Sequence, residues 1–262
     1  MSSCRPYVQV AALAIIAGAC AKPLPITETT GACTPVHGAD VCIWSRMHGD
    51  TVLAVGATVP FKSIEGAAPE TNMVWPPVAS AKIPIDAAIT KQTGLTTLTM
   101  YWEGMGHPPG PFMTPHFDFH FLTVPLASVE AIDCKELSKP AALPAGYGLP
   151  DIPLPPPIAK MFGVNTLVGL CVPNMGMHAL PTTQIEAKDT FRSSMVVGYT
   201  KGQPIFIEPM VTRAMLMEKA TFDLAIPSGG GLTGLMPRHF TAMWDSTGNR
   251  YRFEFSDFKT GS

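Results

Sequence analysis

Charged residues are scarce in this sequence, and basic residues are not in excess. Asp, Glu, Lys and Arg make up 15% of its 262 residues, against roughly 25% in an average soluble domain. The formal net charge is −2, so the chain lacks the basic surface that nucleic-acid binding requires, and we predict no nucleic-acid partner. Hydrophobic residues reach 46%, which excludes a wholly disordered chain and allows a sizeable core.

Several signatures of familiar sites are also absent. The chain contains no G-x-S-x-G motif, no Walker loop and no C-x-x-C pair, which removes the usual sequence signs of an α/β-hydrolase, a P-loop enzyme and a zinc ribbon. The glycine run in Ser228–Gly231 stands alone and predicts a flexible turn rather than a phosphate cradle. No run reaches the roughly 18 apolar residues that a transmembrane helix needs.

The N-terminus carries a short apolar run typical of a signal peptide. Val8–Ala19 follows Arg5 and is about a dozen residues long, too short to span a bilayer. It ends in Ala17-Gly18-Ala19-Cys20, which suits cleavage after residue 19 and lipidation of Cys20. We expect a signal peptide at 1–19 and a periplasmic, lipid-anchored or extracellular protein, attached to a membrane only through that lipid. The alternative is a frayed apolar terminus on a cytosolic protein.

Four cysteines remain after Cys4 and Cys20 are set aside, and an even number favours disulfides in an exported chain. They are Cys33, Cys42, Cys134 and Cys171. Four cysteines allow three pairings, and sequence alone does not choose among them. We prefer Cys33 with Cys42 and Cys134 with Cys171, because a short loop costs the least entropy to close.

Proline and glycine, with 27 and 23 copies, predict many short elements joined by turns. Runs of β-branched and aromatic residues predict a mainly β fold, an antiparallel barrel or sandwich with a few short helices and long Pro-rich loops. We expect a tether at 20–40, a single β-rich domain at 41–262, and an exposed loop at 139–161. The expected strands are 41–46, 51–59, 95–102, 115–124, 166–172, 194–200, 205–208, 221–226, 240–244 and 250–255.

The chemistry concentrates in the run Pro115-His116-Phe117-Asp118-Phe119-His120-Phe121. Side chains alternate between the faces of a strand, so the three phenylalanines share one face and belong in a core. His116, Asp118 and His120 share the other face and are ligands of the kind that first-row metals prefer. The two histidines lie roughly 13 Å apart at strand rise, so a shared ion needs a further ligand from outside the strand.

Three residues outside this strand are candidates for the same site. His178 ends the Met175-Gly176-Met177-His178 turn, and Gly176 permits a close turn that aims it inward. Glu208 is a lone acid in an apolar run and is a candidate carboxylate ligand or general base. His107, in a Gly/Pro loop, is expected to contact and orient a ligand rather than bind the ion. The expected metal ligands are therefore His116, Asp118, His120 and His178.

Simpler interpretations of these residues stay open. His116 and His120 are equally compatible with an exposed strand face, or with a hydrogen-bonded His-Asp-His ladder that holds no metal. His178 is compatible with an ordinary turn residue, and Glu208 with an ion pair to Arg213.

The Gly106-His107-Pro108-Pro109-Gly110 loop, the P-H-F-D-F-H-F strand and the M-G-x-H turn together resemble a poorly characterised family of exported bacterial proteins built on a domain of unknown function. Members of that family carry the H-F-D-F-H-F strand after a G-H-x-P-P-G loop. The resemblance spans about residues 95–255 and also includes Phe206–Met210. It implies a predominantly β fold and homo-oligomers, ring-like among others. It assigns no activity and no catalytic residues.

We interpret the chain as an exported β protein that binds a divalent metal, with Zn²⁺ the first choice. If it is an enzyme, three protein ligands with an open position would activate water for hydrolysis or polarise a carbonyl. The alternative is a non-catalytic structural or ligand-binding oligomer in which the histidines form a metal-free network.

Cleavage of the signal peptide is directly testable. Mass spectrometry of the native protein should show that the first 19 residues have been removed. A mature chain that still begins at Met1 would rule out both export and lipidation, whereas a chain that begins at Cys20 without added lipid mass would rule out lipidation alone.

Overall fold

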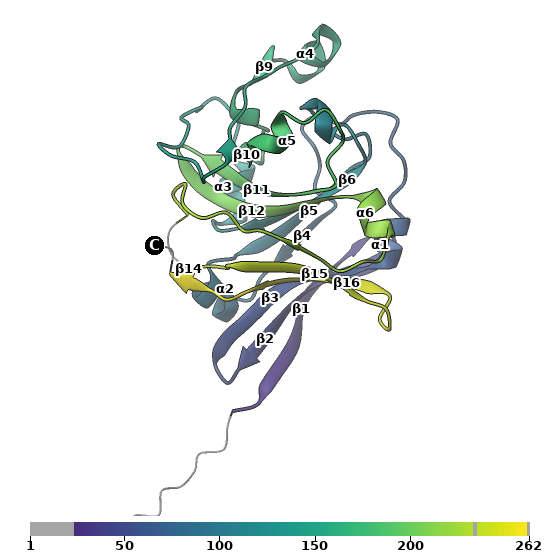
Figure 1. Cartoon of the computed structure of the whole chain (residues 1–262), viewed down its shortest axis with the longest axis vertical. Helices are drawn as coiled ribbons and strands as arrows, with labels where there is room; N and C mark the ends of the chain where they lie inside the picture. Colours follow the sequence, from purple (N-terminus) through teal and green to yellow (C-terminus); the bar gives the residue numbers. More distant parts are fainter. Residues whose placement is uncertain (1–23, 233–234, 261–262) are drawn as a thin grey trace, which may run out of the picture.

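The computed structural model describes residues 24–232 and 235–260, which form two stacked antiparallel sheets (Figure 1). One sheet has six strands, in the order β1 (Ile26–Val36), β2 (Ala39–His48), β3 (Thr51–Pro60), β16 (Arg250–Ser256), β15 (His239–Asp245) and β13 (Phe222–Leu224). The other has seven, in the order β4 (Ala81–Pro84), β5 (Thr97–Glu103), β6 (His116–Leu122), β12 (Gln203–Thr212), β11 (Ser193–Thr200), β10 (Met177–Pro181) and β7 (Tyr147–Gly148).

Neither sheet closes on itself, because the first and last strands of each pair on one side only within the described ranges. The expectation of a mainly β, antiparallel fold is therefore confirmed as a sandwich, and the barrel alternative is wrong. The hairpin between 41–46 and 51–59 is also confirmed, with β2 paired to β3 across the turn at Gly49.

The connections hold short elements. Two further ribbons pair β8 (Ile152–Pro153) with β9 (Thr166–Leu167) and β14 (Leu235–Met236) with β17 (Lys259–Thr260). The helices are α1 (Phe61–Glu65), α2 (Ala87–Thr93), α3 (Leu126–Glu130), α4 (Pro156–Phe162), α5 (Thr182–Ile185) and α6 (Arg213–Met217), and 3-10 turns lie at Gly110–Phe112 and Val168–Leu170. None of the helices in the described part is long and apolar enough to cross a membrane.

The main core lies between the two sheets, and β6 lines it with phenylalanines as predicted. Phe117, Phe119 and Phe121 are fully buried there. Phe119 packs edge-on against Phe253 of β16, with ring centroids 4.6 Å apart, and Phe121 meets Phe255 in the same way at 4.8 Å. The period of two in β6 therefore fixes which of its faces belongs to the sandwich interior.

The opposite face of β6 is covered as well. A second apolar cluster lies over it, built from the connections that cross the outer side of the seven-stranded sheet. Figure 1 shows these segments, with α4 and β9 among them, on the side away from the six-stranded sheet. His116 and His120 are consequently buried, and the alternative of a solvent-exposed histidine face is wrong.

The segment 20–40 is not a tether along its whole length. Residues Ile26–Val36 form the edge strand β1, which pairs with β2 from Ile26 opposite His48 to Val36 opposite Ala39. Threonine and isoleucine favour extended backbone, and an edge strand with solvent on both sides needs no alternation of apolar residues. The expected signal peptide at 1–19 and the expected lipidation site Cys20 lie outside the described residues.

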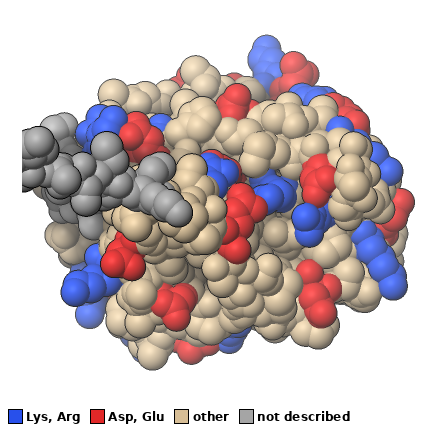
Figure 2. Space-filling model, turned by 90° about the horizontal axis from the view of Figure 1, so that it is seen from below, with Lys and Arg blue, Asp and Glu red and all other residues tan. Residues whose placement is uncertain are grey.

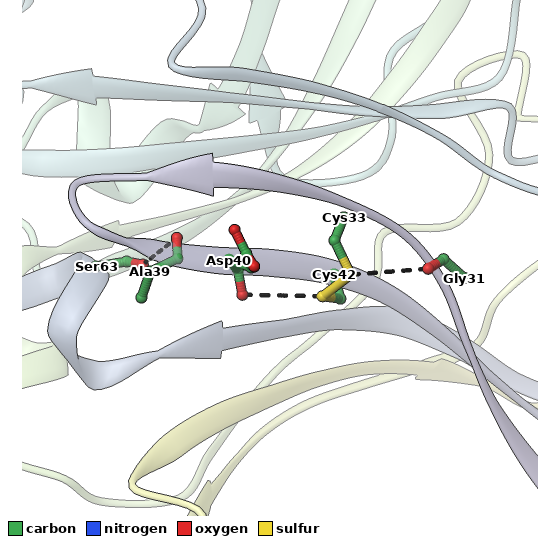
Figure 3. Close-up of a disulfide and its surroundings, with 6 residues drawn as sticks. All are labelled: Gly31, Cys33, Ala39, Asp40, Cys42 and Ser63. Carbon is green, nitrogen blue, oxygen red and sulfur yellow. Dashed lines mark hydrogen bonds between the residues drawn. A yellow bond between two sulfur atoms is a disulfide. The ribbon is translucent and has the colours of Figure 1, made fainter.

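Both preferred disulfides are present. Cys33 and Cys42 lie opposite each other on β1 and β2, and their bond ties the edge strand to its neighbour (Figure 3). Cys134 and Cys171 join the segment after α3 to the segment before β10. Two disulfides indicate an oxidising, non-cytoplasmic compartment.

The Pro-rich segment 139–161 is more ordered than an exposed loop. It contains β7, β8 and most of α4, and it buries Leu154 and Ala159 in the outer cluster. Prolines occupy the first positions of α4, where a missing N–H costs no hydrogen bond, and Gly163 ends the helix with a left-handed backbone.

Charges of both signs are mixed on the face of the molecule shown in Figure 2. The six-stranded sheet carries an ion-pair network, in which Arg46 contacts Glu28 and Glu254, and Arg252 contacts Glu28. No large patch of one sign is visible on that face.

The two disulfides should contribute unequally to stability. They close loops of 9 and 37 residues in sequence separation, so loop-closure entropy predicts losses of about 2.5 and about 4 kcal/mol respectively. Urea unfolding of the Cys33→Ala/Cys42→Ala and Cys134→Ala/Cys171→Ala variants measures both under non-reducing conditions. An equal or larger loss for the first variant would contradict the entropic ranking.

Candidate metal centre

The outer face of the seven-stranded sheet collects the polar residues that the sequence singled out. His116, Asp118 and His120 follow one another along one face of β6. On the neighbouring strand β12, Ile207 pairs with Phe121 and Met210 with Asp118, a register that puts Glu208 opposite His120. Sheet pairing thus brings a carboxylate beside a histidine from a segment almost 90 residues away in sequence.

His178 reaches the same face from β10, which is separated from β12 by β11. Gly198 of β11 lies between them, paired with His178 on one side and with Phe206 on the other. Because Gly198 has no side chain, Phe206 occupies the space above it. The Phe206 ring stacks on His120 with centroids 4.3 Å apart and lies 5.3 Å from His178, so it fixes the orientation of both imidazoles.

The residues fall into two groups, each with two histidines and one carboxylate. We call His120, His178 and Glu208 the inner group; their candidate ligand atoms lie within 4.8 Å of one another, and all three side chains are buried. His120 Nε2 is 3.4 Å from Glu208 Oε2. The inner group is thus assembled from three different strands.

We call His107, His116 and Asp118 the loop group, because His107 comes from the loop before β6. The candidate ligand atoms of this group also lie within 4.8 Å of one another. His116 Nε2 is 3.3 Å from Asp118 Oδ1, and His107 Nε2 is 3.9 Å from Asp118 Oδ2. The two oxygens of one carboxylate therefore face two different imidazoles.

Backbone carbonyls determine the tautomers of three histidines. The Nδ1 atom of each of these rings lies within hydrogen-bond distance of a backbone carbonyl oxygen. The pairs are His107 with Pro108 at 2.8 Å, His116 with Thr114 at 2.6 Å, and His178 with Leu170 at 3.1 Å. A carbonyl only accepts, so Nδ1 carries the proton and Nε2 of the neutral ring carries a lone pair. In His107 and His116 this Nε2 faces the carboxylate of Asp118. This is the arrangement by which proteins usually orient a metal-binding imidazole.

Unpaired buried atoms are concentrated here. Nine buried side-chain N and O atoms lack a hydrogen-bond partner within residues 24–232 and 235–260, and five belong to the two groups: His116 Nε2, Asp118 Oδ1, both ring nitrogens of His120, and Glu208 Oε2. Each unpaired buried group costs roughly 1–3 kcal/mol. A cluster of such costs in one place needs an explanation, and the binding of an ion is one of those that native proteins offer.

Burial shifts the pKa values of these groups in the directions that favour their neutral forms. It lowers the pKa of His120 and of His178 to about 3, and it raises the pKa of Glu208 well above its ordinary value. Burial, and then the charge of Glu208, raise the pKa of Asp118 well above its ordinary value. Carboxylates in such surroundings stay ionised only beside a positive charge, which a bound cation supplies.

A small cavity opens beside both groups. Its volume of about 30 Å³ suffices for a water molecule or an ion. It is lined by His107 and Asp118 of the loop group, by His178 of the inner group, and by Glu103. Most of the remaining wall is apolar and includes Trp75 stacked on Phe162, with ring centroids 3.7 Å apart.

The structure brings all six residues chosen from the sequence to this face of the sheet. It divides them into two separate groups, which the sequence did not predict. His116 and His120 were expected to share one ion with Asp118 between them; the structure gives each histidine its own carboxylate. His107 was expected only to orient a ligand, and it faces Asp118 directly. The alternative ion pair of Glu208 with Arg213 is wrong, since Arg213 donates to the carbonyl oxygens of Ile64 and Glu65.

Sequence reasoning missed Glu103 and the aromatic wall. Glu103 is buried, and in the pairing of β5 with β6 it lies opposite His116. Burial, and next the charge of Asp118, raise the pKa of Glu103 to about 9. The alternation Thr97, Thr99, Tyr101, Glu103 in β5 was the available signal, because it puts Glu103 on the polar face once the register with β6 is known.

Comparisons with known proteins do not identify the chain: no family model matches it, and neither the curated proteins nor the solved structures yield a match. The resemblance drawn from the motifs therefore stays a prediction.

Gly198 should be intolerant of any side chain. A Cβ at this position would overlap the Phe206 ring, so Gly198→Ala forces that ring away from His120 and should cost about 1–3 kcal/mol through overpacking. Gly110→Ala is the matched control, because a Cβ there meets nothing within 4 Å. Urea unfolding measures both, and equal stability of the two variants would show that Phe206 is free to move.

Proposed function

We propose that this protein binds a divalent cation, with Zn²⁺ the first choice, through His120, His178 and Glu208. Two imidazoles and one glutamate form a donor set that zinc uses in catalytic sites. Support for the proposal comes from the complete burial of the inner group and from its unpaired atoms, both ring nitrogens of His120 and Oε2 of Glu208.

The observation that carries the proposal is the separation between His120 Nε2 and Glu208 Oε2, which is 3.4 Å. Two ligands at zinc bond lengths in a tetrahedron stand roughly 3.3–3.5 Å apart. A direct hydrogen bond from a protonated carboxyl to an imidazole would be about 2.5–2.8 Å long. The spacing is thus that of two ligands around an ion rather than that of a donor and an acceptor.

The chain has the means to use such an ion in hydrolysis. Three protein ligands leave a coordination position for water, and zinc in that state polarises a carbonyl or lowers the pKa of the bound water. His178 lines the cavity, so the site has a neighbouring space for a water molecule. The apolar wall around Trp75 and Phe162 excludes bulk water, which strengthens electrostatic interactions inside.

Metal content tests the proposal. Untagged protein incubated with Zn²⁺ and dialysed should retain at least one equivalent of zinc by elemental analysis. His178→Gln should lose one equivalent relative to the wild type, because a site with three protein ligands does not survive the loss of one; removal of a mere outer partner costs only about 10–100-fold in affinity.

His239→Gln is the control, since His239 is an exposed histidine that contacts Asp223 and Thr241 away from the site. It should retain all bound zinc. A wild-type protein that binds no divalent ion would overturn the proposal and leave the metal-free histidine network as the explanation.

A further inference from the structure

We propose that the loop group, His107, His116 and Asp118, binds a second divalent cation of its own. It shares no residue with the inner group. Two of its side chains, His116 and Asp118, are more than nine-tenths buried, and each turns an unpaired atom toward the other: Nε2 of His116 and Oδ1 of Asp118.

The loop group contains acceptors without a donor between them. His107 and His116 both commit Nδ1 to backbone carbonyls, so both Nε2 atoms present lone pairs to the carboxylate of Asp118. Lone pairs of nitrogen and oxygen that face each other repel unless a proton or a cation lies between them. Either a proton or a cation must therefore lie between the imidazole nitrogens and the carboxylate of Asp118.

A proton cannot satisfy this arrangement. A neutral carboxylic acid carries one O–H and donates to one imidazole only, whereas Asp118 directs Oδ1 to His116 and Oδ2 to His107. The separations of 3.3 and 3.9 Å also exceed the roughly 2.5–3.2 Å of hydrogen bonds between such groups. A cation accepts electron pairs from both imidazoles and from the carboxylate at once. Ligands around zinc stand roughly 3.3–3.5 Å apart, which matches the separation of His116 from Asp118, and His107 lies on a loop at a slightly longer distance.

The local sequence holds His107 in place before any ion arrives. Gly106 has a φ of 71°, and a Cβ there would overlap the backbone of Phe112 and Thr114, so this turn requires glycine. The backbone N–H of His107 donates to the carbonyl of Phe112 at 3.2 Å. The loop therefore folds back on the start of β6 and brings His107 to within 4.8 Å of His116, ring centroid to centroid.

The two groups open on the same cavity, because His107 and Asp118 line it together with His178. If the inner group holds an ion, as proposed above, the protein has a centre with two cations beside one shared space. Two bound cations there would supply positive charge to an anionic group in the shared space. This part of the inference rests on the proposed function, whereas ion binding by the loop group does not.

The number of bound ions distinguishes the two proposals. Wild-type protein and His239→Gln, dialysed against Zn²⁺, should each retain two equivalents by elemental analysis. His107→Gln and His178→Gln should each retain one, and the double variant none. His107 is the position of choice in the loop group, because its side chain is 24% exposed and its replacement leaves the fully buried His116 in place.

Each of the other outcomes shows which of the two proposed sites is wrong. Wild-type protein with one equivalent, unchanged by His107→Gln and lost in His178→Gln, would overturn the second site and leave the first. The reverse pattern would overturn the inner site and support the loop group alone. No bound zinc would overturn both, and Asp118→Asn, which keeps the shape of the side chain, should repeat the loss seen in His107→Gln.

Discussion

The burial of both faces of β6 is the constraint on which the rest of the structure depends. One face carries three phenylalanines and needs only apolar contact, which the opposite sheet supplies. The other carries His116, Asp118 and His120, and these are buried just as deeply. A strand of this composition is stable inside a protein only if its polar face finds partners, because desolvated imidazoles and carboxylates are costly to leave unpaired.

The apolar cluster that packs over the polar face of β6 keeps solvent from hydrogen-bonding its side chains. Those side chains must therefore find partners among the neighbouring residues or a bound ligand. Connections between strands pack a second apolar cluster on the outer side of the seven-stranded sheet, and the Cys134–Cys171 disulfide ties two of them together. A small cavity lies beside the two groups. The interactions of the two groups therefore operate at low effective dielectric, where a cation is held strongly and an unpaired carboxylate is disfavoured.

Patterns with a period of two were sufficient to predict much of this. The alternation in β6 predicted which of its faces is apolar, and runs of β-branched and aromatic residues predicted most strands of the sandwich. The low cost of closing a short loop favoured the disulfide pairing that the structure has. The division into two groups could not be predicted, because it depends on the register that sets Glu208 beside His120 and on the turn that returns His107 to Asp118. Edge strand β1 was missed because exposed Thr and Glu residues carry no apolar alternation.

Metal binding of the kind proposed would be coupled to folding. An ion that binds the folded chain and not the unfolded one adds RT ln(1 + [L]/Kd) to stability, which offsets the cost of the buried unpaired atoms of His116, Asp118, His120 and Glu208. Apolar residues at these positions would stabilise the fold at least as well, since buried ionisable groups rarely stabilise a core better than hydrophobic ones do. Five unpaired atoms in one layer of a well-packed sandwich are therefore better explained by a ligand than by the needs of the fold.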